Sequence, residues 1–204
     1  MRIFIPIFLI VLAFGVETAF AGSPSLEERL DGGEVVIKVR EVAGSPMPHL
    51  KAVGVIDAPP KTVWYLVEDC NRWKRNLTRI ERAETVWRRG EDVRCKVTVD
   101  MPFPVDDLTA VTDAKHREKN GTFQRKWHLV EGDYRRNKGS WTITSFKGNP
   151  DRALVVYEVH AEPRMAVPDF IVKAAQSQSI PKLYAKLRKR AREVRGSERG
   201  EAGP

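Results

Sequence analysis

The chain has 204 residues, which is enough for one domain with short appendages, and its composition is ordinary for a folded soluble protein. Lys and Arg total 35 against 27 Asp and Glu, a formal net charge of +8, so the charge alone fits anionic lipid headgroups as well as nucleic acid. Its two cysteines are too few for a domain held together by a disulfide framework, and the sequence has no internal repeats.

The first 21 residues have the pattern of a secretory signal peptide. Arg2 precedes an apolar run over residues 3–16, and residues 19–21 read Ala-Phe-Ala, a small-x-small cleavage site. The run is too short to span a bilayer comfortably, so a retained N-terminal anchor is the alternative. Cleavage would remove Arg2 and Glu17, one charge of each sign, and leave +8. We therefore expect a periplasmic or secreted protein whose mature chain begins near Gly22.

Alternating apolar and polar residues predict strands over residues 34–42 and 50–56, the second either separate or a continuation of the first past a bulge. Pro59 and Pro60 open a helical segment that runs to residue 75, because proline is tolerated in the first turn of a helix. Asn120-Gly121 is typical of a hairpin turn. Further strands are expected over residues 85–88, 93–99, 106–112, 122–131, 137–146 and 153–161.

The last part of the chain changes to helical periodicity. Apolar residues recur at helical spacing from Phe170 to Val194, and Pro181 should kink the helix. An antiparallel sheet with one long helix laid across it is a two-layer α+β fold. We expect an N-terminal extension over residues 22–33, one domain over residues 34–195 and a disordered tail over residues 196–204.

Four stretches share their order and spacing with a known group of domains. They are Ala-Pro-Pro-x-x-Val-Trp at residues 58–64, Pro-Phe-Pro at 102–104, Gly-Ser-Trp at 139–141, and the segment 155–171 that leads into the last helix. Together they resemble the START-like domains, the lipid-transfer and polyketide-cyclase group, over about residues 50–193. The resemblance implies a helix-grip fold. This is a curved antiparallel sheet of about six to seven strands, two short helices and a long C-terminal helix that enclose a cavity.

Strand parity predicts which residues contact a ligand. In residues 122–131 one face carries Phe123, Arg125 and Trp127, and we expect this face to turn toward the cavity. A buried arginine needs a carboxylate or an anionic ligand head, so Arg125 is the candidate anchor and Asp106 a candidate internal partner. The alternative is that Arg125 extends to the rim and keeps its guanidinium in water.

Two other strands add aromatic residues to the apolar face, Trp141 and Tyr157, although such side chains are often ordinary core. A lid, or a surface that contacts a membrane, is expected at two segments beside the cavity, with internal packing as the alternative. Its residues are Met101, Phe103, Val167 and Phe170.

The sequence lacks motifs for catalysis or metal binding. Its four histidines have no metal-ligand spacing, no serine lies in a nucleophile elbow, and there is no glycine-rich phosphate loop. We expect no catalytic residue, no metal and no cofactor. Cys95 alternates with valines in a strand, so a buried free thiol is the default and a disulfide with Cys70 is the alternative.

These observations predict a protein that binds a hydrophobic ligand, expected to be a lipid, and transfers it in the cell envelope rather than acting as an enzyme. An aromatase/cyclase-type enzyme on the same fold is the alternative, and a ligand-free envelope adaptor is a third hypothesis. The expected partners are the ligand and an anionic membrane surface. The basic residues between Lys182 and Arg199 would face that membrane, although they also fit a solvated helix face. We expect a monomer that does not bind nucleic acid.

Overall fold

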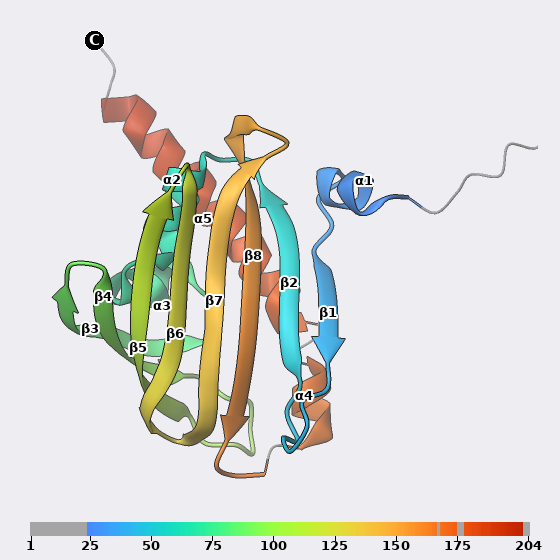
Figure 1. Cartoon of the computed structure of the whole chain (residues 1–204), viewed down its shortest axis with the longest axis vertical. Helices are drawn as coiled ribbons and strands as arrows, with labels where there is room; N and C mark the ends of the chain where they lie inside the picture. Colours follow the sequence, from blue (N-terminus) through green and yellow to red (C-terminus); the bar gives the residue numbers. More distant parts are fainter. Residues whose placement is uncertain (1–23, 167, 175–177, 202–204) are drawn as a thin grey trace, which may run out of the picture.

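The computed structural model describes residues 24–166, 168–174 and 178–201. They form one antiparallel sheet in the order β1-β2-β8-β7-β6-β5-β4-β3, with most helices on one face (Figure 1). The N-terminal helix lies on the other face, where its Leu30 packs with Val36, Val55 and Phe146. The strands are β1 (Val36–Arg40), β2 (His49–Ile56), β3 (Ile80–Arg89), β4 (Asp92–Val99), β5 (Leu108–Lys119), β6 (Thr122–Gly132), β7 (Tyr134–Phe146) and β8 (Asn149–Pro163). The α+β helix-grip architecture predicted from the sequence is confirmed, whereas the predicted signal peptide lies outside the described residues.

The sheet has eight strands, so the prediction of about six to seven was too low. The difference arises at the start of the domain, where the chain reverses and pairs Val39 with Leu50. The two β-branched stretches on either side of this reversal are therefore separate strands, not one bulged strand. β1 forms one edge of the open sheet, and β3 forms the other.

The predicted turn at Asn120-Gly121 is confirmed. Both residues have positive φ, at 50° and 71°, which is the backbone that a two-residue hairpin loop needs between right-handed strands. Lys147 and Gly148 repeat this arrangement between β7 and β8, with φ of 52° and 72°. These tight turns fix the register within two strand pairs, β5 with β6 and β7 with β8.

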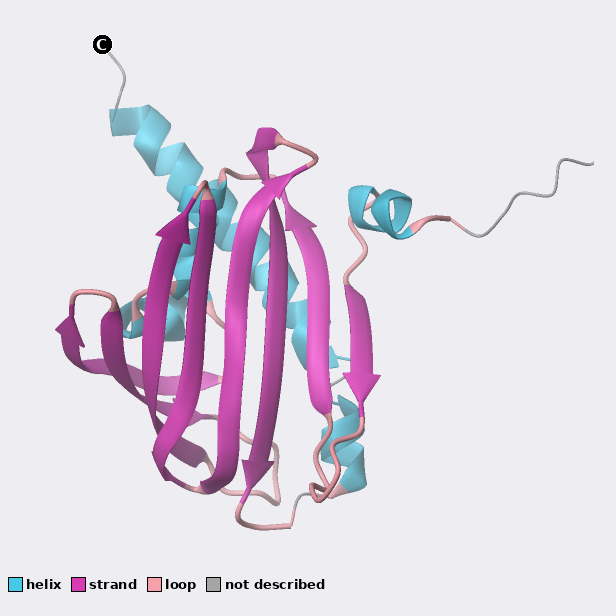
Figure 2. Cartoon of the chain, in the orientation of Figure 1, coloured by secondary structure: helices cyan, strands magenta, loops and turns pink. Residues whose placement is uncertain are grey.

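The helices are α1 (Leu26–Asp31), α2 (Pro60–Val67), the 3-10 turn η1 (Cys70–Arg72), α3 (Trp73–Asn76), α4 (Asp169–Ala174) and α5 (Ile180–Glu201). α5 crosses behind the sheet at an oblique angle (Figure 2). The sequence predicted one kinked helix here; α4 ends at Ala174, residues 175–177 lie outside the described residues, and α5 begins at Ile180 after two π-helical residues. Pro181 is the second residue of α5 and follows a π-helical turn at residues 178–179.

α5 continues past Arg195, the residue after which the sequence predicted a disordered tail. Arg195 ties this end of the helix to the sheet, because its Nη1 donates to the carbonyl of Asp57 at 2.9 Å. The Ser197 hydroxyl donates to the carbonyl of Val194 at 2.8 Å, inside the helix. The helix therefore extends into the region predicted as a tail, and residues 202–204 lie outside the described residues.

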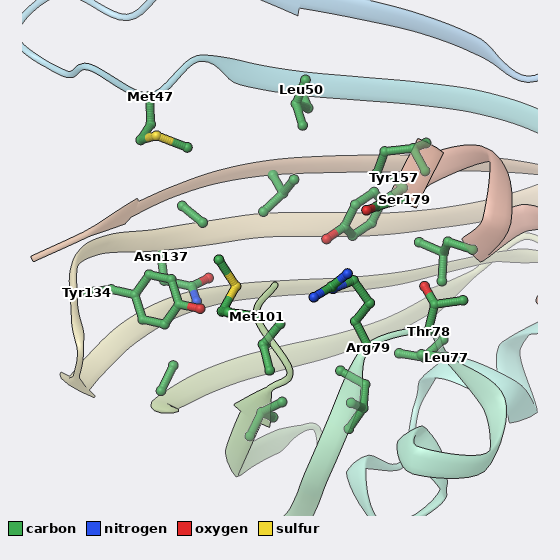
Figure 3. A pocket seen from close by; sticks show the side chains of 18 of the residues that line it. Met47, Leu50, Leu77, Thr78, Arg79, Met101, Tyr134, Asn137, Tyr157 and Ser179 are labelled. Atoms are coloured by element: carbon green, nitrogen blue, oxygen red, sulfur yellow. The ribbon is translucent and has the colours of Figure 1, made fainter. Parts of the chain in front are cut away.

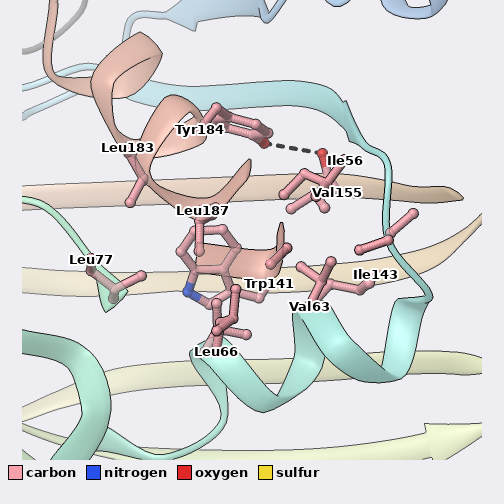
Figure 4. Close-up of a cluster of buried hydrophobic side chains, with 14 of the residues drawn as sticks. Ile56, Val63, Leu66, Leu77, Trp141, Ile143, Val155, Leu183, Tyr184 and Leu187 are labelled. Carbon is pink, nitrogen blue, oxygen red and sulfur yellow. Dashed lines mark hydrogen bonds between the residues drawn. The ribbon is translucent and has the colours of Figure 1, made fainter. Parts of the chain in front are cut away.

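The main hydrophobic core lies between the sheet and the helices α2 and α5 (Figure 4). Tyr184 of α5 is fully buried, and its hydroxyl lies 3.0 Å from the carbonyl oxygens of both Ala52 and Val155. Its ring covers Gly54, where a Cβ would lie only 2.7 Å from the ring carbons. This close approach positions α5 over β2 and β8.

Candidate ligand-binding cavity

A cavity of about 350 Å³ lies between the sheet and the helices. Its walls come from the inner face of the sheet, the residues around α3 and β3, the first turn of α5, and α4. The loops around Met47 and Met101 complete it (Figure 3). Most of the lining is apolar, for example Leu50, Val97, Val99, Val159, Ile171 and Leu183. An apolar cavity of this size suits a small hydrophobic molecule.

Trp127, Trp141 and Tyr157 form the aromatic wall of the cavity. The Tyr157 ring centroid lies 4.3 Å from that of Trp141 and 6.1 Å from that of Trp127. Gly139 stands opposite Trp127 on the neighbouring strand, and a Cβ there would lie 2.4 Å from the indole. Because glycine leaves this space open, the Trp127 ring can lie flat across β7.

The cavity wall also carries a few polar groups, including Asn137 and the hydroxyls of Tyr134 and Tyr157. The indole Nε1 of Trp127 donates to Oδ1 of Asn137 at 3.0 Å, and Tyr134 lies beside Asn137 (Figure 3). The hydroxyls of Tyr134 and Tyr157 have no hydrogen-bond partner within the part of the chain that the structure describes. Burial raises the pKa of Tyr134 to about 12 and also raises the pKa of Tyr157. Both phenols therefore stay protonated at neutral pH and can donate to a ligand.

Arg79 is the one charged side chain among the described residues that line the cavity. It precedes β3 in the left-handed region, with φ of 57°, which is uncommon for a residue other than glycine. Its Nε donates to the carbonyl of Asp100 at 2.8 Å, and its guanidinium points into the cavity (Figure 3). This arrangement places a fixed positive charge against an apolar space.

Only some of the residues that strand parity predicted to contact a ligand line the cavity. Trp127, Trp141 and Tyr157 line the cavity, whereas Phe123 and Arg125 do not. All these side chains lie on the inner face, but α2 and η1 cover the part of β6 that carries Phe123 and Arg125. Asp106 is exposed in the loop before β5, so it is not the internal partner of Arg125.

Arg125 is fully buried and has an environment that the sequence did not predict. Its Nη1 lies 2.6 Å from Nε2 of His116, and its Nη2 donates to Sγ of Cys95 at 3.1 Å. Its guanidinium carbon lies 4.9 Å from the ring centroid of Trp73. Neither predicted alternative holds, because the guanidinium reaches neither the cavity nor the rim.

Burial, and secondly the positive charge of Arg125, lower the pKa of His116 to about 3. The imidazole is therefore neutral at physiological pH, and its Nε2 accepts the hydrogen bond from Arg125. Burial also lowers the pKa of Arg125, to about 9, which leaves the guanidinium charged at neutral pH. The Arg125–His116 pair therefore belongs to the buried packing beneath η1.

Cys70 and Cys95 form a disulfide, with their Cα atoms 6.2 Å apart. The default prediction of a free Cys95 thiol was therefore wrong, and the alternative holds. The reason is that η1 packs on β4 and brings Cys70 over the buried face of Cys95.

The predicted lid residues differ in exposure. Met101 lines the cavity, whereas the side chain of Phe103 is 92% exposed and that of Phe170 is 58% exposed. Val167 lies outside the described residues. Because Pro102 and Ile171 also line the cavity, the segments that carry Phe103 and Phe170 border it.

Within residues 24–166, 168–174 and 178–201, no group of three or more His, Cys, Asp or Glu side chains is arranged to hold a metal ion. No helix in these ranges is both long enough and apolar enough to cross a membrane.

Six polar lining residues were not found from the sequence: Thr78, Arg79, Thr112, Tyr134, Asn137 and Ser179. Parity could have found Asn137, which shares a face of β7 with Trp141. Tyr134 is turned inward by an irregularity in the pairing of β7 with β8 between Tyr134 and Arg136. Arg79 depends on a left-handed backbone that no local pattern signals.

Comparison with protein families shows that residues 56–188 match the family described as polyketide cyclase / dehydrase and lipid transport. No match is found among curated protein sequences.

Solved structures with the same fold include a STAR-related lipid transfer protein fragment from Xanthomonas axonopodis. It has 18% identity and a TM-score of 0.66, over 79% of this chain and 99% of that one. Human STARD10 is 14% identical with a TM-score of 0.69, over 83% and 77%. The Zhui aromatase/cyclase from Streptomyces sp. R1128 is 17% identical with a TM-score of 0.58, over 73% and 96%.

Proposed function

Because the chain belongs to the polyketide cyclase / dehydrase and lipid transport family, we propose that it binds a lipid in the cavity beneath α5 and transfers it within the cell envelope. The observation that carries this proposal is the cavity of about 350 Å³, with its aromatic wall and its largely aliphatic lining. Its phenol, amide and guanidinium groups are suited to holding one polar end of a ligand.

The energetics suit exchange rather than permanent capture. Burying a methylene group away from water gains about 0.8 kcal/mol, whether the apolar surroundings are a cavity or a bilayer. The apolar part of a lipid therefore gains nearly as much from the membrane as from the protein. Selectivity then depends on the polar groups, and the rate depends on opening the segments around Met101 and α4.

Two surfaces support contact with a membrane. Phe103 and Phe170 expose aromatic rings next to the cavity. On α5, Lys182, Lys189 and Arg192 face the solvent. Other basic residues of α5 are already occupied, since Arg188 donates to the carbonyl of Val55 and Lys186 to that of Leu77. The proposed membrane contact therefore combines two aromatic rings with a small set of free cations.

The envelope location rests on two features. The Arg2 start, the apolar run and the Ala-Phe-Ala site have the order of a signal peptide. The Cys70–Cys95 disulfide is of the kind that persists in an oxidising compartment. Intact mass of the protein isolated from its native host should give an N-terminus at Gly22, and retention of residues 1–21 would contradict the location.

An aromatase/cyclase-type enzyme is the second candidate. The hydroxyls of Tyr134 and Tyr157, which have no partner among the described residues, favour it because they could hold the carbonyl oxygens of a polyketide. Recovery of a polycyclic product after incubation with a polyketide substrate would support this candidate over lipid transfer.

Transfer of a fluorescent phospholipid or fatty acid from donor to acceptor vesicles tests the proposal. The informative variant is Leu183→Trp, which adds a large ring to the cavity wall from the first turns of α5. Ala185→Trp is the matched control, because Ala185 lies on the exposed face of the same helix. We expect Leu183→Trp to transfer no faster than vesicles alone and Ala185→Trp to match the wild type. Equal transfer by both variants would contradict a role for the cavity.

A further inference from the structure

The cavity has an uneven distribution of charge. Its described lining contains many apolar side chains and several neutral polar ones, but only one ionised group, the guanidinium of Arg79. No acidic side chain among these lining residues offsets it. Its acidic neighbour outside the lining is Asp100, whose Oδ2 lies 3.6 Å from Nη2, and the two side chains are 35% (Arg79) and 58% (Asp100) exposed. A ligand that brings a negative charge to the cavity side of Arg79 would therefore add a second counter-charge to this guanidinium.

The backbone holds Arg79 in place. Its carbonyl accepts from the N–H of Asp100 at 3.0 Å, and its Nε donates to the carbonyl of the same residue at 2.8 Å. Together with the left-handed φ of 57°, these two bonds orient the guanidinium plane before any ligand arrives. A strained backbone at such a position is typical of functional sites.

The outer nitrogens of Arg79 remain available. Nη2 lies 3.6 Å from Oδ2 of Asp100, which is longer than a good hydrogen bond, and the Asp100 side chain is 58% exposed. Nη1 has no hydrogen-bond partner within the described residues. A guanidinium whose Nε is fixed still offers N–H groups on both Nη atoms, in the fork that suits a carboxylate or a phosphate.

The size of the cavity limits the rest of the ligand. A volume of about 350 Å³ lies at the low end of the range for pockets that take drug-sized molecules, roughly 300–1,000 Å³. One acyl chain fits such a space better than two. The aromatic wall and the aliphatic residues beside it would contact this chain.

Building on the lipid-binding function proposed above, we propose that the ligand is a single-chain amphiphile with an anionic head, and that Arg79 binds this head while the chain lies along the aromatic wall. Carboxylate and phosphate heads share the required chemistry. The proposal assigns to Arg79 the anchoring role that the sequence suggested for Arg125.

Displacement of the neutral fluorophore N-phenyl-1-naphthylamine by three C16 compounds tests the proposal: hexadecanoate, hexadecyl phosphate and hexadecanol. For the wild type we expect one or both anions to bind about tenfold more tightly than the alcohol, a difference of about 1.4 kcal/mol. The anion that binds more tightly identifies the head as carboxylate or phosphate. Arg79→Met should abolish the preference for the anion without weakening hexadecanol.

Arg82→Met is the matched control, because Arg82 is exposed on β3, three residues after Arg79, and does not line the cavity. It should keep the wild-type preference. Equal binding of anions and alcohol by the wild type, or an unchanged preference in Arg79→Met, would overturn the role of Arg79 while leaving hydrophobic binding intact. Failure of the wild type to bind the fluorophore and all three compounds would instead overturn the proposed function, and this inference with it.

Discussion

The Nη2 atom of Arg125 lies 3.1 Å from the Sγ atom of Cys95, so a fully buried guanidinium rests against the disulfide that joins η1 to β4. It also contacts the neutral ring of His116, the carbonyl of Glu68, the Sγ of Cys70 and the ring of Trp73, and none of these contacts is a carboxylate. Arg125, on the inner face of β6, therefore stabilises the fold beside the cavity and does not line the cavity itself.

Arg125→Met tests this structural role. The substitution leaves Nε2 of His116 without its donor in a buried site, which typically costs about 1–3 kcal/mol. We expect a lower free energy of unfolding in urea but ligand affinity within about twofold of the wild type. Weakened ligand binding with unchanged stability would mean that Arg125 anchors the ligand after all.

Reduction of the disulfide should destabilise the protein. Cys70 and Cys95 are 25 residues apart in sequence, and closing a loop of that size typically contributes about 3 kcal/mol. Urea unfolding with and without a phosphine reductant measures the difference. The double variant Cys70→Ala/Cys95→Ala serves as the control and should not respond to the reductant; an equal response by both proteins would exclude the disulfide as the cause.

Stability should fall in mild acid because of His116. Its pKa is about 3 in the folded protein against about 6.5 when unfolded, so the unfolded chain binds more protons between these values. The free energy of unfolding therefore decreases as the pH falls below about 6.5, by about 2 kcal/mol at pH 5 from this residue. His116→Gln, which keeps an acceptor for Arg125, should lose less stability than the wild type between pH 7.5 and pH 5. Identical losses would contradict the assignment.

Gly139 should not tolerate a side chain. A Cβ there would lie 2.2 Å from the carbonyl oxygen of Glu158 and 2.4 Å from the Trp127 ring. Gly139→Ala should therefore displace Trp127, shift the tryptophan fluorescence and cost about 1–3 kcal/mol. Gly196→Ala is the control, since a Cβ there meets no atom within 4 Å and replaces glycine inside α5. It should be neutral or slightly stabilising, and a loss of stability equal to that of Gly139→Ala would argue against a steric cause.

The exposed rings beside the cavity should contribute to membrane contact. Phe103→Ser and Phe170→Ser together should weaken binding to vesicles that contain anionic lipid at least about threefold, because each ring loses apolar area that a bilayer can cover. Val86→Ser is the control, since Val86 is 52% exposed on the edge strand β3. Co-sedimentation measures the binding, and equal effects of the control and the double variant would contradict a specific membrane surface.

Local patterns in the sequence were sufficient to predict the architecture of the fold. Alternation located the central strands, Asn120-Gly121 located a hairpin, and the helical spacing of Leu183 and Leu187 located the helix that covers the cavity. These features depend on neighbours in sequence, which a single chain displays directly. The extra strand was harder to count, because its separation depends on a chain reversal between Val39 and Leu50.

The candidate site was less predictable because it depends on what covers each part of the sheet. Parity correctly placed Arg125 and Trp127 on one face, but η1 covers the first and the cavity meets the second. The side chain of Arg79 reaches the cavity because its backbone is left-handed, and no local sequence pattern predicts that conformation. Long-range packing therefore determines which inward-facing residues line the cavity.

Native mass spectrometry of the protein, purified without detergent from cells that contain envelope lipids, shows whether the cavity beneath α5 holds a ligand. Wild type and Ala185→Trp should each carry one hydrophobic molecule per chain, released by organic solvent, whereas folded Leu183→Trp should carry none. A ligand-free wild type, or a Leu183→Trp variant that carries the same molecule at the same occupancy, would contradict the claim that the cavity beneath α5 is the binding site.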